Sequence, residues 1–172
     1  TIPHYIKSNA NNHPKDIALR EKKFGVWITK DWLQCLEEIE NITLGLHVKG
    51  ITGKKTIAIL GNNTPRWTLA EIAVQSLGSI PLGIYSDALE SEIIYLIDYS
   101  SCRVVFVEDE EQADKIMSLS DSKGKVDLIV YDEPKGMNKY DDKRLISYKN
   151  LLKIGNEFKK NNTNFFNKLL DN

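Results

Sequence analysis

Residues 56–85 read TIAILGNNTPRWTLAEIAVQSLGSIPLGIY, and this stretch decides the fold. Two continuous apolar runs, 56–60 and 80–84, enclose a segment with helical periodicity. Continuous apolar runs of this length are typical of strands buried on both faces, as in a parallel sheet. Thr64 can cap the intervening helix, with Pro65 as its first residue, where a missing N–H costs nothing. The stretch therefore predicts a strand–helix–strand unit with a right-handed crossover.

The same alternation continues along the chain. Apolar runs at 104–107 and 128–130 predict two further buried strands. Helical patterns separate the runs, one opening at Asp87 and a weaker one spanning 109–120. Strands that alternate with helices predict an α/β fold whose mostly parallel sheet has flanking helices, here over residues 50–132.

The residues before this core predict a small β-hairpin and a helix. Short strand patterns at 17–21 and 26–29 are joined by a loop containing Gly25. Asp31 and Gln34 have the spacing of a helix capping box. After the core, we expect a long polar loop with two turns over 133–150, a short helix over 150–154, a Lys/Asn-rich linker over 157–164 and an amphipathic turn around 165–170. The chain accordingly divides into an arm, hairpin and first helix (1–50), an α/β core (51–132) and a loop and linker region (133–172).

Composition excludes several classes of protein. The 172 residues are 41% hydrophobic and 27% charged, as in an ordinary soluble domain with one core. A net charge of −1 provides no general attraction to nucleic acid or to an anionic membrane. No apolar run approaches the roughly 18 residues of a membrane span. Cys35 and Cys102 suggest no disulfide framework, so we expect reduced thiols and a cytoplasmic location.

Candidate site residues follow from the geometry of parallel sheets, because ligands bind where the carboxyl ends of the strands meet. The first two strand ends provide the candidates Gly61, Asn62, Asn63, Thr64, Tyr85, Ser86 and Asp87. The segment 61–64 leads directly into a helix N-terminus, which attracts anions. It can equally be a tight turn with a cap. The later strand ends are acidic and would repel phosphates without a divalent cation, and we interpret Asp109, Glu110 and Glu111 as a solvated helix start.

No complete catalytic set can be recognised. The histidines His4, His13 and His47 lack a metal-ligand spacing, and no nucleophile has an adjacent base. Trp27, Trp32 and Trp67 are interpreted as core aromatics. We therefore expect no catalytic residue and no metal ligand within this chain.

Several segments in the same order resemble the start of the AMP-forming acyl-CoA synthetases, the adenylate-forming ligase superfamily, and above all its bacterial long-chain fatty acid–CoA ligases. The residues that carry the resemblance are Ile17 to Lys22, Gly25 to Trp27, Ile57 to Trp67, Ala73 to Tyr85, Val130 to Gly136 and Tyr140 to Asp142. These segments are distributed along nearly the whole chain.

The resemblance implies that the chain is an N-terminal part of a synthetase that uses ATP, Mg and coenzyme A. The family's phosphate loop, its Glu associated with Mg²⁺ and its adenylation lysine match no residue here, so this part is expected to hold no cofactor and to be inactive alone. Its partners would be the missing C-terminal part of the enzyme, a fatty or aromatic carboxylic acid, and in addition a second copy in a homodimer. Two alternatives are a stand-alone α/β binding or scaffold module and one half of a split synthetase.

Overall fold

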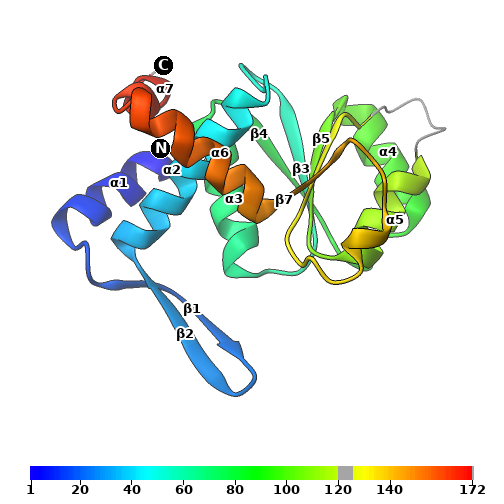
Figure 1. The fold of residues 1–172 in the computed structure, drawn as a ribbon, viewed down its shortest axis with the longest axis horizontal. Coiled ribbons are helices and arrows are strands. Elements are labelled where there is room, and N and C mark those ends of the chain that lie inside the picture. Colours follow the sequence, from blue (N-terminus) through cyan, green and yellow to red (C-terminus); the bar gives the residue numbers. More distant parts are fainter. Residues whose placement is uncertain (120–125, 172) are drawn as a thin grey trace.

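A five-stranded parallel sheet forms the centre of the computed structural model, which describes residues 1–119 and 126–171 (Figure 1). The spatial order of the strands is β4-β3-β5-β6-β7. Their bounds are β3 (Thr56–Leu60), β4 (Ile80–Ile84), β5 (Val104–Val107), β6 (Leu128–Tyr131) and β7 (Leu145–Ser147). The predicted α/β class with a parallel sheet is confirmed.

Helices cover both faces of this sheet (Figure 1). On one face lie α2 (Trp32–Val48), α3 (Pro65–Ser76) and α6 (Tyr148–Asn161), and on the other lie α4 (Glu90–Ser100) and α5 (Glu110–Ser118). Successive residues of a strand point to opposite faces. In β3, accordingly, Ile57 and Ile59 belong to the first core while Ala58 and Leu60 belong to the second. This double burial explains why the strand sequences are apolar without a break.

The chain ends lie beside the first face. Helix α1 (Ile2–Asn12) packs against α2, and the short helix α7 (Phe165–Leu170) follows α6. His4 Nε2 of α1 lies 3.8 Å from Asp171 Oδ1 just after α7, so segments from the two ends of the chain are neighbours. Within residues 1–119 and 126–171, every helix is too short or too polar to span a bilayer.

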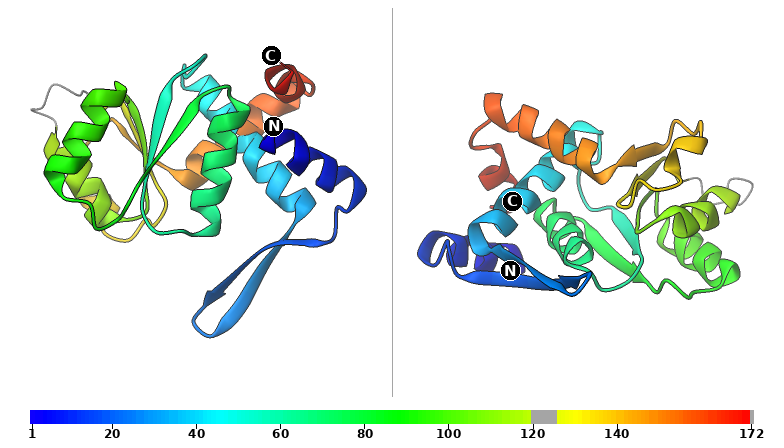
Figure 2. Two further views of the ribbon diagram at one scale, coloured as in Figure 1. Left: turned by 180° about the vertical axis from the view of Figure 1, so that it is seen from behind. Right: turned by 60° about the horizontal axis from the view of Figure 1, so that its bottom comes forward.

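The strands β1 (Ile17–Lys23) and β2 (Val26–Asp31) form the predicted antiparallel hairpin. Figures 1 and 2 show it projecting away from the rest of the molecule. Its loop has only two residues, Phe24 and Gly25, with φ of 48° and 81°. Positive φ at both positions is the requirement of the type I′ turns that suit hairpins.

Helices α2 and α6 cross with their backbones in contact. A Cβ added to Gly155 would overlap the carbonyl oxygen of Asn41, and one added to Gly45 would lie 2.5 Å from the carbonyl oxygen of Leu151. Only glycine permits so close an approach. The crossing therefore depends on two residues that are poor helix formers by propensity.

Several expectations outside the core were wrong. The region 133–150 is not only loop and turns, because besides a 3₁₀ turn at Met137–Lys139 it contains β7 and the start of α6. The expected short helix and linker are one long helix, α6, and helix α1 was not anticipated. Helix α4 begins at Glu90 instead of Asp87. Its first turn is closed by the Leu89 N–H, which donates to Glu92 Oε2 at 2.8 Å.

The other predicted helix starts are confirmed. Asp31 and Gln34 form the capping box of α2, and Thr64 caps α3 by accepting from the Trp67 N–H. The helix expected over 109–120 is α5, for which Asp109 is the cap; Ser120 lies outside the described residues.

Candidate functional site

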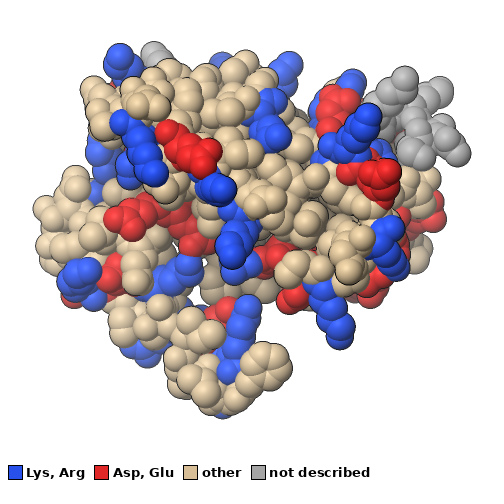
Figure 3. Space-filling view, viewed as in Figure 1, with Lys and Arg blue, Asp and Glu red and all other residues tan. Residues whose placement is uncertain are grey.

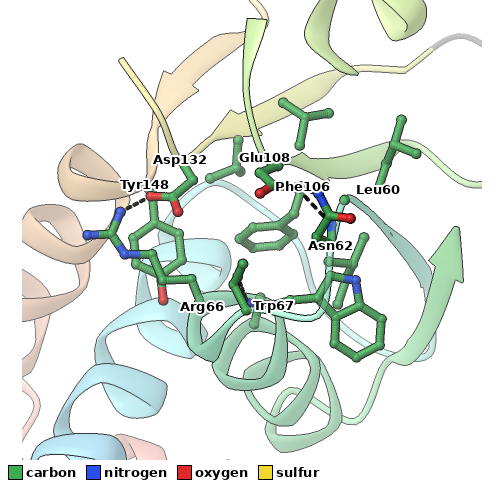
Figure 4. A pocket seen from close by; sticks show the side chains of 14 residues that line it. Leu60, Asn62, Arg66, Trp67, Phe106, Glu108, Asp132 and Tyr148 are labelled. Atoms are coloured by element: carbon green, nitrogen blue, oxygen red, sulfur yellow. Dashed lines mark hydrogen bonds and ion pairs between the residues drawn. The ribbon is translucent and has the colours of Figure 1, made fainter. Parts of the chain in front are cut away.

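The carboxyl ends of β3, β5 and β6 surround a small pocket (Figure 4). Its volume is about 30 Å³, which is room for a water molecule or two but far below the roughly 300 Å³ or more of small-molecule sites. The lining combines apolar side chains with charged ones: Leu60, Asn62, Arg66, Trp67, Phe106, Glu108, Asp132 and Tyr148 among others. The pocket is therefore a place where strands and helices meet, with polar side chains at its rim, and it is too small for a small-molecule ligand.

Asn62 joins three strand ends on one side of this pocket. Its backbone N–H and its Nδ2 donate to Glu108 Oε2 at 2.7 and 2.9 Å, and its Oδ1 accepts from Ser86 Oγ at 3.0 Å. Gly61 allows this approach, because a Cβ there would lie 2.8 Å from Glu108 Cβ. The sequence-predicted candidates Asn62 and Ser86 are thus brought together, with the acidic end of β5 as their partner.

A carboxylate of the chain itself therefore lies at the loop that precedes α3. Such a position near a helix N-terminus favours negative charge, and Glu108 supplies that charge here. Thr64 satisfies a further N–H of the helix start, at 3.2 Å from the Trp67 nitrogen. Whether the loop 61–64 also receives an external anion stays a prediction.

The other side of the pocket holds a chain of charged and aromatic side chains. Arg66 forms an ion pair with Asp132 at the end of β6, and its guanidinium lies over the Tyr148 ring, 5.2 Å from the centroid. The Tyr148 hydroxyl donates to Glu38 Oε1 at 2.8 Å, and Glu38 pairs with Lys30 of β2. This network links the hairpin, α2, α6, α3 and the end of β6. Figure 4 shows the part of it formed by Arg66, Asp132 and Tyr148.

The titration behaviour of Tyr148 follows from its burial. Burial raises the pKa of the Tyr148 hydroxyl well above its ordinary value, and the charge of Glu38 and the hydrogen bond to Glu38 add to the rise. The phenol therefore remains protonated at neutral pH and serves as a donor. With every charge in this network paired, the arrangement holds elements together and offers no free base for a reaction.

The two thiols are no better as nucleophiles. Burial raises the pKa of Cys35 to about 11, against a smaller lowering by Lys30. Burial also raises the pKa of Cys102. Because the thiolate is the reactive form, both groups are inert at neutral pH.

The acidic start of α5 differs in part from the interpretation as a solvated helix start. Glu111 is exposed and lies 3.3 Å from Lys115, as expected for such a start. Asp109, however, caps the helix by accepting from the Gln112 N–H at 3.1 Å, and Glu110 pairs with Lys139. Among the described residues, no group of three His, Cys, Asp or Glu side chains could hold a metal ion.

The remaining candidates lie elsewhere. Tyr85 is exposed and borders a shallow groove together with Tyr95 of α4, separate from the pocket. Asn63 is exposed at the turn. Trp27, interpreted as a core aromatic, is 62% exposed, so that interpretation was wrong. Trp67 is only half-buried and packs on the first core.

Sequence reasoning missed the roles of Arg66 and Tyr148. Arg66 follows the helix cap at a strand end, which could have marked it as a rim residue. Tyr148 has no local signal, because its hydrogen-bond partner Glu38 is 110 residues away in the sequence.

The model of one protein family, described as AMP-binding enzyme, matches residues 6–162. The chain belongs to this family. A long-chain-fatty-acid–CoA ligase of Homo sapiens, ACSBG2, is 25% identical over 122 residues, which is 71% of this chain and 18% of the relative. The chain therefore spans about a fifth of the length of this curated relative.

Solved structures share the fold of this chain. A long-chain-fatty-acid CoA ligase described as putative from Rhodopseudomonas palustris superposes with a TM-score of 0.72 at 21% identity, over 88% of this chain and 36% of that chain. The anthranilate CoA ligase AuaEII, solved with anthranoyl-AMP, gives a TM-score of 0.73 at 17% identity, over 88% and 27%. The family and fold implied by the sequence resemblance are thereby confirmed.

Proposed function

We propose that this chain is the N-terminal part of an ATP-dependent acyl-CoA synthetase, which converts a carboxylic acid, ATP and coenzyme A into acyl-CoA, AMP and pyrophosphate. The match of the AMP-binding family to residues 6–162 carries this proposal. The name of the human relative favours a long-chain fatty acid as the substrate. An aromatic acid is the second candidate, because a structural neighbour is an anthranilate CoA ligase.

The residues at the sheet edge suit a supporting role better than a phosphate site. Glu108 already occupies the loop before α3, and Asp132 is held by Arg66, so the rim supplies paired carboxylates where phosphates would need free donors. The described residues therefore do not fit ATP or its Mg²⁺ at this edge. In the proposed enzyme, ATP, Mg²⁺ and coenzyme A are bound by the parts of the synthetase outside this segment, which spans 18% of the human relative.

The proposed contribution of this chain is to support the substrate-binding region of the complete enzyme. Gly61, Asn62, Asn63 and Thr64 at one strand end, and Tyr85 and Ser86 at the next, would border the acyl and coenzyme A region of the complete enzyme. Support comes from the bond between Ser86 and Asn62, which fixes the two strand ends against each other. The alternative role for the same residues is packing against the rest of the synthetase.

Three narrower proposals accompany this function. A cytoplasmic location is supported by the free, buried thiols of Cys35 and Cys102. A homodimer is supported by the exposed apolar side chains of the chain. The division into 1–50, 51–132 and 133–172 is also retained as a proposal for the organisation of the enzyme's first part.

A test of the function compares the chain with the product of its complete reading frame. We expect the complete product to release pyrophosphate from ATP when a long-chain fatty acid is added, and residues 1–172 alone to release none. Failure of the complete product with both fatty and aromatic acids would contradict the synthetase proposal. Activity that appears only when a second polypeptide is mixed with the chain would identify a split synthetase. A reading frame that ends at Asn172 without any such partner would favour the stand-alone module.

A further inference from the structure

The end of the β1–β2 hairpin carries apolar side chains far from either core. Phe24 is fully exposed, and Val26 and Trp27 are 66% and 62% exposed. In Figures 1 and 2 this end points away from the body of the molecule. A protruding element with several neighbouring apolar side chains is a candidate contact surface, unlike single exposed residues scattered over a domain.

The backbone of Phe24 is strained in a way that favours a binding role. Its φ of 48° lies in the left-handed region, where a bulky residue is an outlier. Asn or Asp before Gly25 would suit this two-residue turn much better. The ring gains nothing from packing, because the side chain is fully exposed. Strain of this kind clusters at sites where a side chain must be presented to a ligand.

The charges around this end are predominantly basic. The strand register places Arg20, Lys22, Trp27 and Thr29 on one face of the hairpin, and Lys22 Nζ lies 6.0 Å from the centroid of the Trp27 ring. Within the described part of the chain, neither Arg20 nor Lys22 takes part in an ion pair. On the other face, Lys23 lies 3.4 Å from Glu21.

The local charge therefore departs from the charge of the whole chain. Residues 17–30 contain four basic side chains and one acidic one, whereas the whole chain has a net charge of −1. Figure 3 shows the uncharged end of the hairpin at the bottom of the view, bordered mainly by basic side chains. The expectation that the chain has no attraction to an anionic membrane rested on the net charge of the whole chain, which differs from the local charge at this end.

We propose that the hairpin end docks on the surface of a bilayer that contains anionic lipids. Phe24 and Trp27 enter the interfacial layer, where aromatic rings are favoured, and Arg20 and Lys22 lie against the lipid phosphates. A bilayer fits better than an acidic protein as the partner. A bilayer is fluid and can accommodate a projecting ring, whereas a protein would need a preformed pocket of matching shape. The inference is independent of the proposed synthetase activity.

Sedimentation of the chain with lipid vesicles tests the proposal. We expect binding to vesicles of phosphatidylcholine mixed with phosphatidylglycerol, and little to phosphatidylcholine alone. The double variant Phe24→Ser/Trp27→Ser should lower the affinity by about tenfold or more, and Lys22→Gln by about fivefold. The matched control is Tyr95→Ser/Tyr99→Ser, which removes two exposed rings from α4 and should leave vesicle binding unchanged.

A second variant distinguishes a role of the Phe24 ring in binding from a role in folding stability. Phe24→Asn relieves the left-handed strain, so it should raise the melting temperature while weakening vesicle binding. The proposal is overturned if the chain ignores anionic vesicles, or if the hairpin variants bind as well as the unmodified chain does. It is equally overturned if Phe24 and Trp27 instead mediate association of the chain with itself or with another protein.

Discussion

The two faces of the sheet are built from the same strands but are covered in different ways. On the first face, α2 and α6 meet with their backbones in contact, and the Tyr148 hydroxyl of α6 donates to Glu38 of α2. On the second face, α4 packs through Ile93 and Ile97 and leaves Tyr95 and Tyr99 largely in solvent. The same strands form the centre of both faces. The helices on the two faces should therefore differ in how much stability a substitution removes.

The largest expected effect of a single substitution is at the helix crossing of the first face. Gly155→Ala places a methyl group onto the carbonyl oxygen of Asn41. Because the obstacle is backbone, the helices must separate, and we expect the free energy of unfolding to fall by about 3 kcal/mol or more. Urea denaturation monitored by circular dichroism measures this loss.

The matched control is Gly50→Ala, where an added Cβ meets nothing within 4 Å and only the positive φ of 83° is unfavourable. We expect a loss of about 1–2 kcal/mol there. Equal losses at the two glycines would show that the crossing is looser than the structure indicates, and the contrast between the faces would weaken.

The next effect concerns the buried hydroxyl that joins α6 to α2 on the first face. Tyr148 is 3% exposed, and Tyr148→Phe removes its donor to Glu38 while keeping the ring beneath Arg66. A hydrogen bond to a charged group contributes about 1.5–3 kcal/mol, so thermal and urea denaturation should show a loss in that range. Tyr99→Phe, an equivalent change on the exposed side of α4, should have no effect. A neutral Tyr148→Phe would mean that Lys30 alone satisfies Glu38.

How much of this could be predicted from the sequence depends on where the information lies. The strands β3 to β6 were predictable, because double burial makes their residues continuously apolar. Helix α6 was not, since its apolar positions Leu151, Leu152 and Phe158 are interspersed with Lys and Asn, and Gly155 resembles a helix breaker although it is a contact residue. The three residues of β7 are only half-buried at the sheet edge, so they provide little pattern.

The candidate site divides in the same way. The rule that ligands bind at strand ends identified Asn62 and Ser86, which the structure joins by a hydrogen bond. It could not show that Glu108 is their partner, because which strand lies beside β3 is a property of the topology. The network through Tyr148 needs contacts across more than a hundred residues and has no local signature.

Removal of a helix cap should lower the free energy of unfolding by the same amount on both faces, because a cap acts within one helical turn. Thr64→Ala removes the acceptor for the Trp67 N–H on the first face, and Asp109→Ala removes that for the Gln112 N–H on the second. We expect each to lower the free energy of unfolding by about 1 kcal/mol. A much larger loss for Thr64→Ala would mean that the first face is also sensitive to substitution at the start of α3.

The smallest expected effect is on the open side of α4. Tyr99 is 80% exposed and stacks on Tyr95 with a centroid distance of 5.7 Å. Because the stacked pair remains in water, Tyr99→Ser should change the free energy of unfolding by less than about 0.5 kcal/mol. Urea denaturation beside the unmodified chain measures the difference. A loss above about 1 kcal/mol would mean that the pair stabilises α4. The second face would then be stabilised by its surface aromatics as well as by Ile93 and Ile97. The two faces would differ in the kind of contact that stabilises them, and no longer in how much stability a substitution removes.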